Sequence, residues 1–457
     1  MTTRTIVIAA GFVVAAGLGS WRLQAIGPIA IDDQFRAAQA SRFEVWIADQ
    51  SDTRPGFGGQ LLIYQGADLA GAAAAKATPA RIDLGAETAD LCQKATGSNP
   101  VRPHMILFNQ SQTHAILSFV ASGHVVIFDA ESRKPLTCLQ TTVSESTKTR
   151  QAHAAFPAPD GSYVLVANQN GKRLERIDTN FAKNTFTHNS AATLDLATCK
   201  TPAGRPCESA DLRPMNWPIC PIVDASSRYG FVTLRGGGLF VVDAKATPMT
   251  IVAEYDKATV NGNGCGGVQI GNAMYLNSGG SPVNVSAKEP AHPALYGFDV
   301  YRFPLSGYAA SNAPNTPVPT RVFSKAGAAD SHGMAAVAGG RYLWIMDRHG
   351  DVAEIVEVAS GKRVNTVTLN GALTDNAAPD LVDVDPSGTR LFVALRGSIP
   401  LSGDPHNATG TTPGLGIIEV SGDGRTGSLA AIVRIANPNQ QDKQQPDPHG
   451  VRVRLRK

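Results

Sequence analysis

The stretch HAAFPAPDGSYVLVANQN, residues 153–170, decides the fold of this chain. An apolar run leads into Pro159-Asp160-Gly161, and a second run rich in β-branched and aromatic residues follows. Proline, aspartate and glycine favour tight turns, and the flanking runs are typical of strands. The stretch therefore predicts a hairpin of two strands with polar residues at its start and its end.

This pattern recurs along the chain, for example in HGMAAVAGGRYLWIMDRHG (332–350) and DLVDVDPSGTRLFVALRG (380–397). The repeats share one residue at the start of the first strand, which we call the inner position. It is occupied by His104, His153, Ile219, Asn263, His332, Asp380 and His449. Sixteen residues later a second polar residue recurs, at Gln169, Arg235, Arg348 and Arg396. Such a repeat is expected to gather both positions around the axis of a closed ring.

The repeat predicts an all-β fold, a seven-bladed β-propeller. The inner positions are spaced by about 57 residues, which suits a four-stranded blade with long loops. The strands FEVWIADQ (43–50) and GQLLIYQG (59–66) have no inner strand before them, whereas DPHGVRVRLRK (447–457) has no strands after it. We therefore expect the C-terminal strand to pair with the N-terminal blade and close the ring, making residues 43–457 one domain.

The N-terminal residues have the layout of an export signal. Arg4 precedes an apolar run from Ile6 to Leu18, which is short for a membrane span. We expect residues 1–19 to be a signal peptide, with an uncleaved anchor as the alternative, and residues 20–42 to be a linker. The predicted location is periplasmic or secreted, with membrane contact only through such an anchor.

The six cysteines are an even number, as expected for disulfides in an oxidising compartment. Cys199 and Cys207 are the favoured local pair, because they lie eight residues apart in one loop. Cys220 and Cys265 lie beside inner positions of adjacent blades, where a disulfide is favoured over thiolate ligation of a metal.

The charge pattern argues against nucleic-acid binding. The formal net charge is +3 for 457 residues, and the terminal VRVRLRK is the one basic run that stands out. No phosphate-binding glycine loop is present, so no nucleotide cofactor is indicated. The expected ligand is a small molecule.

The inner positions are the candidate functional site. Four of the ten histidines share this one register, which favours a site over scattered surface residues. Imidazoles with a carboxylate suit a transition metal, copper first and then zinc or iron. The predicted catalytic and metal-binding residues are His104, His153, His332, His449 and Asp380. The predicted substrate-binding residues are Arg235, Arg348, Arg396, Gln169 and Asn263.

Other polar residues receive weaker predictions. Asp49 ends the strand that should lie beside His449, and could join the site. His406 lies in the long insertion 398–413, which could gate it; the other long insertions are 179–215 and 281–320. Histidines outside the register are expected to lie on the surface: His114, His124, His188 and His292, with His349 pointing away from the site.

The hairpins HAAFPAPDGSYVLVANQNGKRLERID and DLVDVDPSGTRLFVALRG, with DPHGVRV, resemble the YVTN and lactonase-like seven-bladed propeller superfamily. The resemblance spans residues 43–457 as architecture. It implies two kinds of enzyme: lactonases and muconate cyclases that use histidine and arginine without a metal, and exported copper enzymes such as nitrous-oxide reductase, thiocyanate dehydrogenase and methanethiol oxidase. The paired histidines of the copper enzymes are missing here, so no specific reaction carries over.

Three functional hypotheses follow. The leading one is a metal-dependent oxidoreductase that acts on a small anionic or sulfur- or nitrogen-containing molecule, with a redox partner protein. The second is a metal-free enzyme of the lactonase or cyclase kind that uses histidine as base and arginine to bind an anion. The third is a non-catalytic binding scaffold, because a hydrated propeller channel is also polar.

Overall fold

The computed structural model describes residues 42–279, 297–310, 316–397, 409–438 and 445–456. The proposed signal peptide and the linker up to residue 41 lie outside these ranges, as do His292 and His406.

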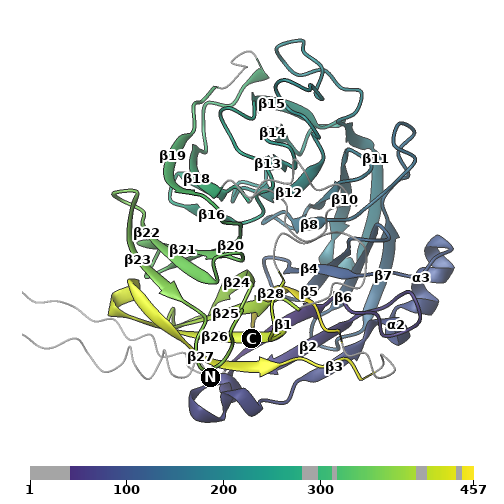
Figure 1. Ribbon diagram of the computed structural model, residues 1–457. Helices are drawn as coiled ribbons and strands as arrows, with labels where there is room; N and C mark the ends of the chain where they lie inside the picture. Colours follow the sequence, from purple (N-terminus) through teal and green to yellow (C-terminus); the bar gives the residue numbers. More distant parts are fainter. Residues whose placement is uncertain (1–41, 280–296, 311–315, 398–408, 439–444, 457) are drawn as a thin grey trace, which may run out of the picture.

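The described residues form seven antiparallel four-stranded sheets arranged as blades of a ring (Figure 1). The first blade consists of β28 (Pro448–Leu455), β1 (Phe43–Asp49), β2 (Gln60–Gln65) and β3 (Ala80–Asp83). The second consists of β4 (Pro103–Phe108), β5 (His114–Phe119), β6 (His124–Asp129) and β7 (Pro135–Gln140). The third consists of β8 (Ala154–Pro157), β9 (Tyr163–Asn168), β10 (Arg173–Asn180) and β11 (Thr185–Asp195).

The fourth blade consists of β12 (Pro218–Val223), β13 (Tyr229–Leu234), β14 (Leu239–Asp243) and β15 (Thr250–Tyr255). The fifth consists of β16 (Gly267–Ile270), β17 (Ala273–Asn277), β18 (Gly297–Pro304) and β19 (Thr320–Ala326). The sixth consists of β20 (Ser331–Val337), β21 (Tyr342–Asp347), β22 (Val352–Glu357) and β23 (Lys362–Thr368). The seventh consists of β24 (Pro379–Val384), β25 (Arg390–Leu395), β26 (Gly414–Ser421) and β27 (Thr426–Arg434).

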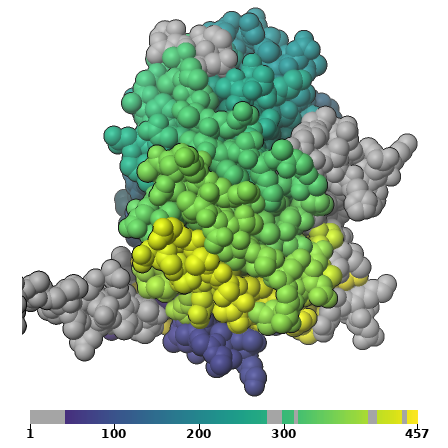
Figure 2. All heavy atoms as spheres, turned by 60° about the vertical axis from the view of Figure 1, so that its left-hand side comes forward, coloured from purple at the N-terminus to yellow at the C-terminus, as the bar shows by residue number. Residues whose placement is uncertain are grey.

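The C-terminal strand closes the ring, as the sequence predicts. β28 pairs antiparallel with β1, with Val45 opposite Val453 and Ile47 opposite Val451. It also contacts β4 on one side and β24 on the other. The innermost strands thus surround a common axis, and Figure 2 shows the later blades following one another in chain order around the side of the ring.

Apolar side chains pack between the blades. All six residues of β9, YVLVAN, are buried, and so are all seven of β1. One cluster joins Trp46 of β1 to Ile106 of β4 and Leu117 of β5, across the junction of the first two blades. Because each sheet is covered on both faces, its central strands read as near-continuous apolar runs.

Two segments expected to be insertions contain strands of the ring. β11 lies within 179–215, and β18 lies within 281–320. β11 was missed because its residues are mostly exposed or half-buried and polar, as befits an outermost strand. Most of the insertion 398–413 lies outside the described residues.

Three disulfides stabilise the described structure: Cys92–Cys138, Cys199–Cys207 and Cys220–Cys265. The last two confirm the pairs favoured from sequence. Two short helices, α2 (Leu84–Glu87) and α3 (Ala89–Thr96), precede β4, and Cys92 attaches α3 to β7. In the described ranges, no helix has the length and apolar character to cross a membrane.

Candidate functional site

In five blades the inner position lies in a β-bulge at the start of the innermost strand. In β20, Ser331 pairs with Asp347 and Met334 with Ile345, so one strand advances by three residues while the other advances by two. Equivalent register shifts occur in β4, β12, β24 and β28. A bulge leaves a residue out of the ladder and re-aims its side chain. Inner side chains of different blades can therefore meet one another.

Glycine follows the inner histidine in two blades, at Gly333 and Gly450, and lets neighbouring backbones approach. A Cβ on Gly333 would lie 2.2 Å from the carbonyl oxygen of Asp380, and a Cβ on Gly450 would lie 2.6 Å from that of His104. Any larger residue would push these strands apart. The two glycines thus determine how closely adjacent inner residues lie.

The four inner histidines, which come from four blades, form one row of rings. His449 and His104 are stacked, with ring centroids 3.6 Å apart. His153 meets His104 edge-on at 4.6 Å, and His332 meets His449 edge-on at 5.1 Å. The structure therefore brings together all four histidines that the repeat register selects, although their chemical roles remain predictions.

Asp380, the inner residue of β24, is held by basic side chains. Its Oδ1 accepts a hydrogen bond from Nδ1 of His332 at 2.5 Å, and its Oδ2 lies 2.7 Å from Nη1 of Arg396 and 3.3 Å from Nη1 of Arg348. Nε2 of His449 lies 3.7 Å from Oδ2. Burial alone would raise the pKa of Asp380, but these groups, Arg348 foremost, hold it well below its usual range. Asp380 is therefore an ionised carboxylate inside the protein.

Arg348 and Arg396 are also paired with further carboxylates. Nη2 of Arg348 lies 2.7 Å from Oδ2 of Asp330. Arg396 binds Asp447 through two hydrogen bonds of 2.8 Å, from Nε and Nη2. Two-pronged pairs of this kind fix the orientation of a guanidinium. These two arginines thus hold Asp380 in place, which differs from the substrate-binding role expected of them.

The inner histidines are neutral near neutral pH. Burial, followed by the charges of His449 and His153, holds the pKa of His104 well below its usual range. Burial, with His332 and Arg235 nearby, lowers the pKa of His153 to about 3. Burial likewise lowers the pKa values of His332 and His449, although Asp380 opposes this. A neutral imidazole can accept a proton as a general base and, as the imidazolium then formed, can donate it again.

A hydrogen-bond chain determines the tautomer of His104. Nε of Arg102 can only donate, and it donates to Oε1 of Gln50 at 2.6 Å. The amide nitrogen of Gln50 then donates to Nδ1 of His104 at 2.6 Å. Neutral His104 therefore carries its proton on Nε2. This Nε2 is buried and has no hydrogen-bond partner in the described structure.

Two further predicted binding residues, Arg235 and Gln169, differ in their exposure. Arg235 is partly exposed, and its guanidinium lies over the ring of Trp217 at 5.6 Å from the centroid. Gln169 is buried, and its Nε2 has no hydrogen-bond partner among the described residues.

The register assigned to the glycine-rich fifth blade was wrong by two residues. Gly267 begins the regular pairing with β17, opposite Leu276, as Met334 does opposite Ile345 in β20. Counting back two residues, as from Met334 to His332, gives Cys265 as the inner position, and Asn263 precedes it. The loop that joins β16 to β17 is shorter than the corresponding loops of the other blades. Aligning this blade by its turn therefore places the inner position two residues too early.

Asp49 does not reach the histidine row through any contact in the described structure. Its carboxylate accepts hydrogen bonds from Ser51, Gln60 and the backbone N–H of Asp447. The next residue, Gln50, makes the contact with His104 instead. Because successive side chains of a strand point in opposite directions, only one of the neighbours Asp49 and Gln50 can point toward the site.

Two three-residue groups among the described residues offer closely spaced donor atoms for a metal, and one of them includes Asp380. Ligand atoms of His332, Asp380 and His449 all lie within 4.8 Å of one another. The fit to an ion is poor, because Asp380 already accepts from two guanidinium groups and from His332. The stacked rings of His104 and His449 also cannot both direct nitrogens at one ion lying between them. The metal assignment thus remains a prediction.

Several residues of the site were not predicted, although the sequence contains a signal for them. Two residues before an inner position stand Arg102, Gln151, Asp330 and Asp447. Three of these make the hydrogen bonds and ion pairs described above. A third recurrent polar position, compared across all blades, would have identified them.

Two histidines expected on the surface are buried. Nε2 of His114 lies 2.8 Å from Oδ1 of Asn184, and Nε2 of His124 lies 2.9 Å from Oγ1 of Thr96. Both belong to strands whose outward faces are covered by neighbouring elements, which strand periodicity cannot indicate. His349 is exposed, as predicted.

The chain matches no family model and no curated protein. Among solved structures it is similar to a periplasmic gluconolactonase of Pseudomonas aeruginosa, with 14% identity, a TM-score of 0.54, and coverage of 90% of this chain and 99% of the other. It is also similar to a Bacteroides fragilis protein described as a 6-phosphogluconolactonase, with 12% identity, a TM-score of 0.53, and coverage of 90% and 98%. A Lactobacillus plantarum protein is similar at 10% identity, with a TM-score of 0.54 and coverage of 90% and 99%. The predicted resemblance to lactonase-like seven-bladed propellers is confirmed for the fold.

Proposed function

We propose that the protein is a metal-free hydrolase of the lactonase kind, in which His332 acts as general base. The hydrogen bond between Asp380 and Nδ1 of His332 carries this proposal. An ionised carboxylate can only accept, so Nδ1 carries the proton and Nε2 keeps its lone pair. The arrangement is that of a base oriented by a carboxylate, in a protein whose fold resembles that of lactonases.

In this mechanism Nε2 of His332 removes a proton from water, and the resulting hydroxide adds to the carbonyl carbon of a cyclic ester. Nε2–H of His104 stabilises the negative charge that develops on the carbonyl oxygen. Collapse of the intermediate breaks the ring C–O bond, and the proton held by His332 passes to the leaving oxygen. Lactone and water thereby give one hydroxy acid, with no change in oxidation state.

An anionic group on the substrate would bind at Arg235. Of the three arginines predicted to bind substrate, Arg235 is partly exposed, whereas Arg348 and Arg396 are buried against carboxylates. Gln169 and Asn263 are the remaining predicted substrate-binding residues. This supports a small, acidic lactone as the class of substrate.

The test is hydrolysis of a panel of sugar-derived and acidic lactones, followed as acid release by a pH indicator. We expect activity that survives dialysis against EDTA. Replacing His332 with Asn should lower kcat by roughly 10²- to 10⁴-fold, the range of a general base. Replacing Arg235 with Ala should mainly raise KM for acidic lactones.

His349→Asn is the matched control, because His349 is exposed and follows Arg348 in the chain. It should retain full activity. Hydrolysis that is equal in the His332 and His349 variants would contradict the proposal. Absence of hydrolysis of every lactone would favour the scaffold hypothesis instead.

The second candidate is a transition-metal oxidoreductase at His332, Asp380 and His449, supported by their donor atoms lying within 4.8 Å of one another. Copper would be the first metal to examine, then zinc and iron, and a redox partner protein would exchange electrons with the site. This candidate requires activity that chelation removes and one of these metals restores. Elemental analysis of protein purified without chelators separates the two candidates.

We further propose that the protein works outside the cytoplasm. Three disulfides support an oxidising compartment, and one similar structure is that of a periplasmic enzyme. Fractionation of the producing cells, with mass spectrometry of the mature N-terminus, would determine whether residues 1–19 are removed as a signal peptide.

A further inference from the structure

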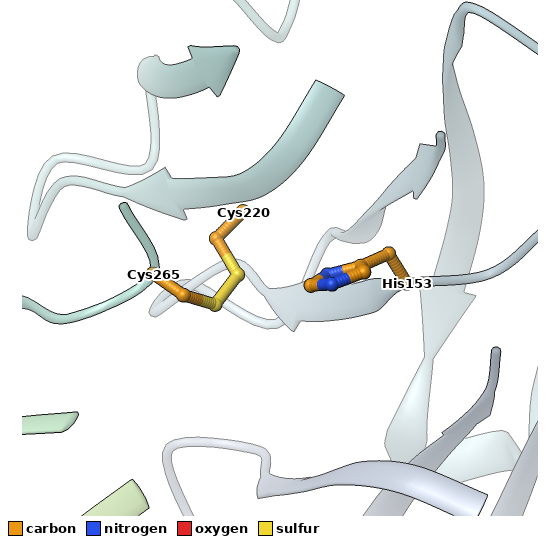
Figure 3. A group of neighbouring side chains, drawn as sticks. All are labelled: His153, Cys220 and Cys265. Carbon is orange, nitrogen blue, oxygen red and sulfur yellow. A yellow bond between two sulfur atoms is a disulfide. The ribbon is translucent and has the colours of Figure 1, made fainter. Parts of the chain in front are cut away.

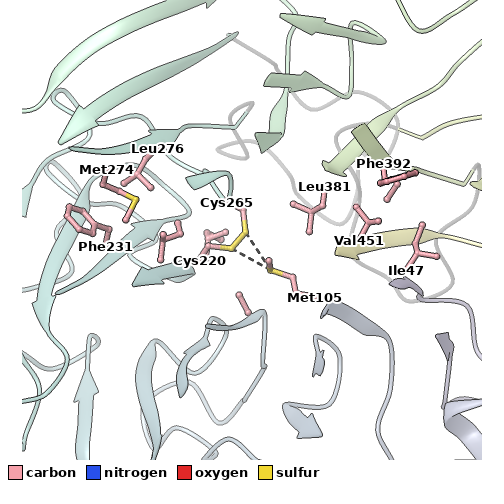
Figure 4. Close-up of a cluster of buried hydrophobic side chains, with 14 of the residues drawn as sticks. Ile47, Met105, Cys220, Phe231, Cys265, Met274, Leu276, Leu381, Phe392 and Val451 are labelled. Atoms are coloured by element: carbon pink, nitrogen blue, oxygen red, sulfur yellow. Dashed lines mark hydrogen bonds between the residues drawn. A yellow bond between two sulfur atoms is a disulfide. The ribbon is translucent and has the colours of Figure 1, made fainter. Parts of the chain in front are cut away.

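A cluster of three sulfur atoms lies at the end of the histidine row, outside the proposed catalytic group. Cys220 of β12 is joined to Cys265, which precedes β16, by a disulfide. Sδ of Met105, which follows His104 in β4, lies 3.8 Å from Sγ of Cys220 and 3.7 Å from Sγ of Cys265, as the dashed lines in Figure 4 show. All three residues are buried. Three blades thus contribute sulfur to one place.

A nitrogen donor completes this cluster. One ring nitrogen of His153 and the two Sγ atoms all lie within 4.8 Å of one another. Figure 3 shows the ring of His153 directed at the disulfide from the neighbouring blade. Nδ1 of His153 is buried and has no hydrogen-bond partner among the described residues. The imidazole is neutral, because burial lowers the pKa of His153 to about 3.

These four side chains match the requirements of a soft metal ion. Thiolates and thioethers prefer Cu(I), and imidazole also binds copper. In a tetrahedral site with metal–sulfur bonds of about 2.3 Å, neighbouring sulfur ligands lie roughly 3.7 Å apart. The thioether of Met105 already has this separation from both Sγ atoms. Only the two Sγ atoms, which are bonded to each other, must move apart.

We propose that reduction of the Cys220–Cys265 disulfide opens a binding site for a soft monovalent cation of the Cu(I) type, with Cys220, Cys265, Met105 and His153 as ligands. The oxidised protein has no such site, because both thiolates are consumed in the S–S bond. The disulfide would therefore prevent metal binding until it is reduced.

The reductant is a small dithiol, whose two sulfur atoms supply two electrons and two protons. The S–S bond breaks, Cys220 and Cys265 become thiols, and the dithiol becomes a disulfide. Cu(I) then binds the two sulfur atoms as thiolates, and the two thiol protons are released to water. Copper stays in the same oxidation state throughout. Entry from the side of His153 is consistent with its being the one partly exposed ligand.

The experiment is titration of reduced full-length protein with Cu(I) in competition with a chromogenic chelator, with Ag(I) as a redox-inert probe. We expect one tightly bound ion per chain in the reduced protein and none in the oxidised protein. X-ray absorption of the copper-loaded sample should show sulfur scatterers at about 2.3 Å with one nitrogen. Circular dichroism of the reduced protein verifies that the fold persists.

Variants identify the ligands. Met105→Leu preserves the shape of the side chain and should weaken Cu(I) binding by about tenfold or more. Cys220→Ser combined with Cys265→Ser should abolish it. The matched control is Cys199→Ser with Cys207→Ser, which removes a different disulfide and should leave the affinity unchanged.

Equal Cu(I) affinity in the wild type, the Met105 variant and the double Cys220/Cys265 variant would overturn the proposal. So would a reduced protein that loses its fold, because the site requires the ring. The proposal does not depend on hydrolysis: His332→Asn should bind Cu(I) normally, and failure of lactone hydrolysis would leave the titration unaffected.

Discussion

At the scale of single residues, the chemistry of the site depends on which atoms carry protons. Asp380 is ionised because Arg348 and Arg396 face it, and it therefore directs the proton of His332 to Nδ1. Gln50 donates a hydrogen bond to Nδ1 of His104, so the proton of this imidazole lies on Nε2. The sequence register identified both histidines. It could not assign their tautomers, because Gln50 and His104 belong to different blades and meet only in the folded protein.

Buried neutral histidines should make the protein sensitive to acid. Burial lowers the pKa of His124 to about 4 and that of His153 to about 3, below the unfolded value of 6.5. Between these values the unfolded chain binds more protons than the folded chain. Stability should therefore be complete above about pH 6.5 and should fall on acidification, by about 1.4 kcal/mol per pH unit for each such group.

Urea denaturation at intervals between pH 7 and pH 4 measures this loss. His124→Gln should make the free energy of unfolding less dependent on pH, because one proton-binding group of the unfolded state is gone. The exposed His349→Gln serves as the control and should leave the slope as it is in the wild type. An unchanged slope in the His124 variant would refute the explanation.

At the scale of secondary-structure elements, the bulged inner strands decide the site geometry. Each bulge re-aims one side chain, and the residue after it must fit against the next blade. Gly450 of β28 meets that demand by having no Cβ near the carbonyl oxygen of His104. The bulges were not predicted, because an extra residue in one strand is visible only when its partner strand is known.

Gly450→Ala should therefore destabilise the protein by about 1–3 kcal/mol, the usual effect of overpacking a close contact. The added methyl group would push β28 away from β4 and disturb the stacking of His449 on His104. The free energy of unfolding and lactone hydrolysis should both decrease. Wild-type values of both quantities would show that the strands can separate without penalty.

At the scale of the whole molecule, the ring is stable because it has no free end. β28 joins the last residues of the chain to β1, and it lies between β4 and β24. Val451, fully buried, belongs to the same apolar cluster as Ile47 and Phe392. Closure thus links the first and the last blades into one cooperative unit.

Deleting residues 446–457 should abolish cooperative unfolding. The deletion exposes the edge of β1 and removes Asp447 and His449 from the site. A shorter deletion, of Arg456 and Lys457 only, should retain the native transition. Limited proteolysis and denaturant unfolding compare the two chains. A native, cooperative transition in the chain that lacks β28 would disprove closure by this strand.

The sequence by itself determined the blade count, the closing strand and the set of inner histidines. Strand and turn signals are local and repeat seven times, so errors in one blade are corrected by the others. Only the tertiary structure decided that Arg348 and Arg396 face Asp380, that Cys265 and not Asn263 is an inner residue, and that Met105 meets a disulfide from two other blades. Those contacts join residues far apart in the chain, and their geometry depends on bulges and ring closure, which no local pattern records.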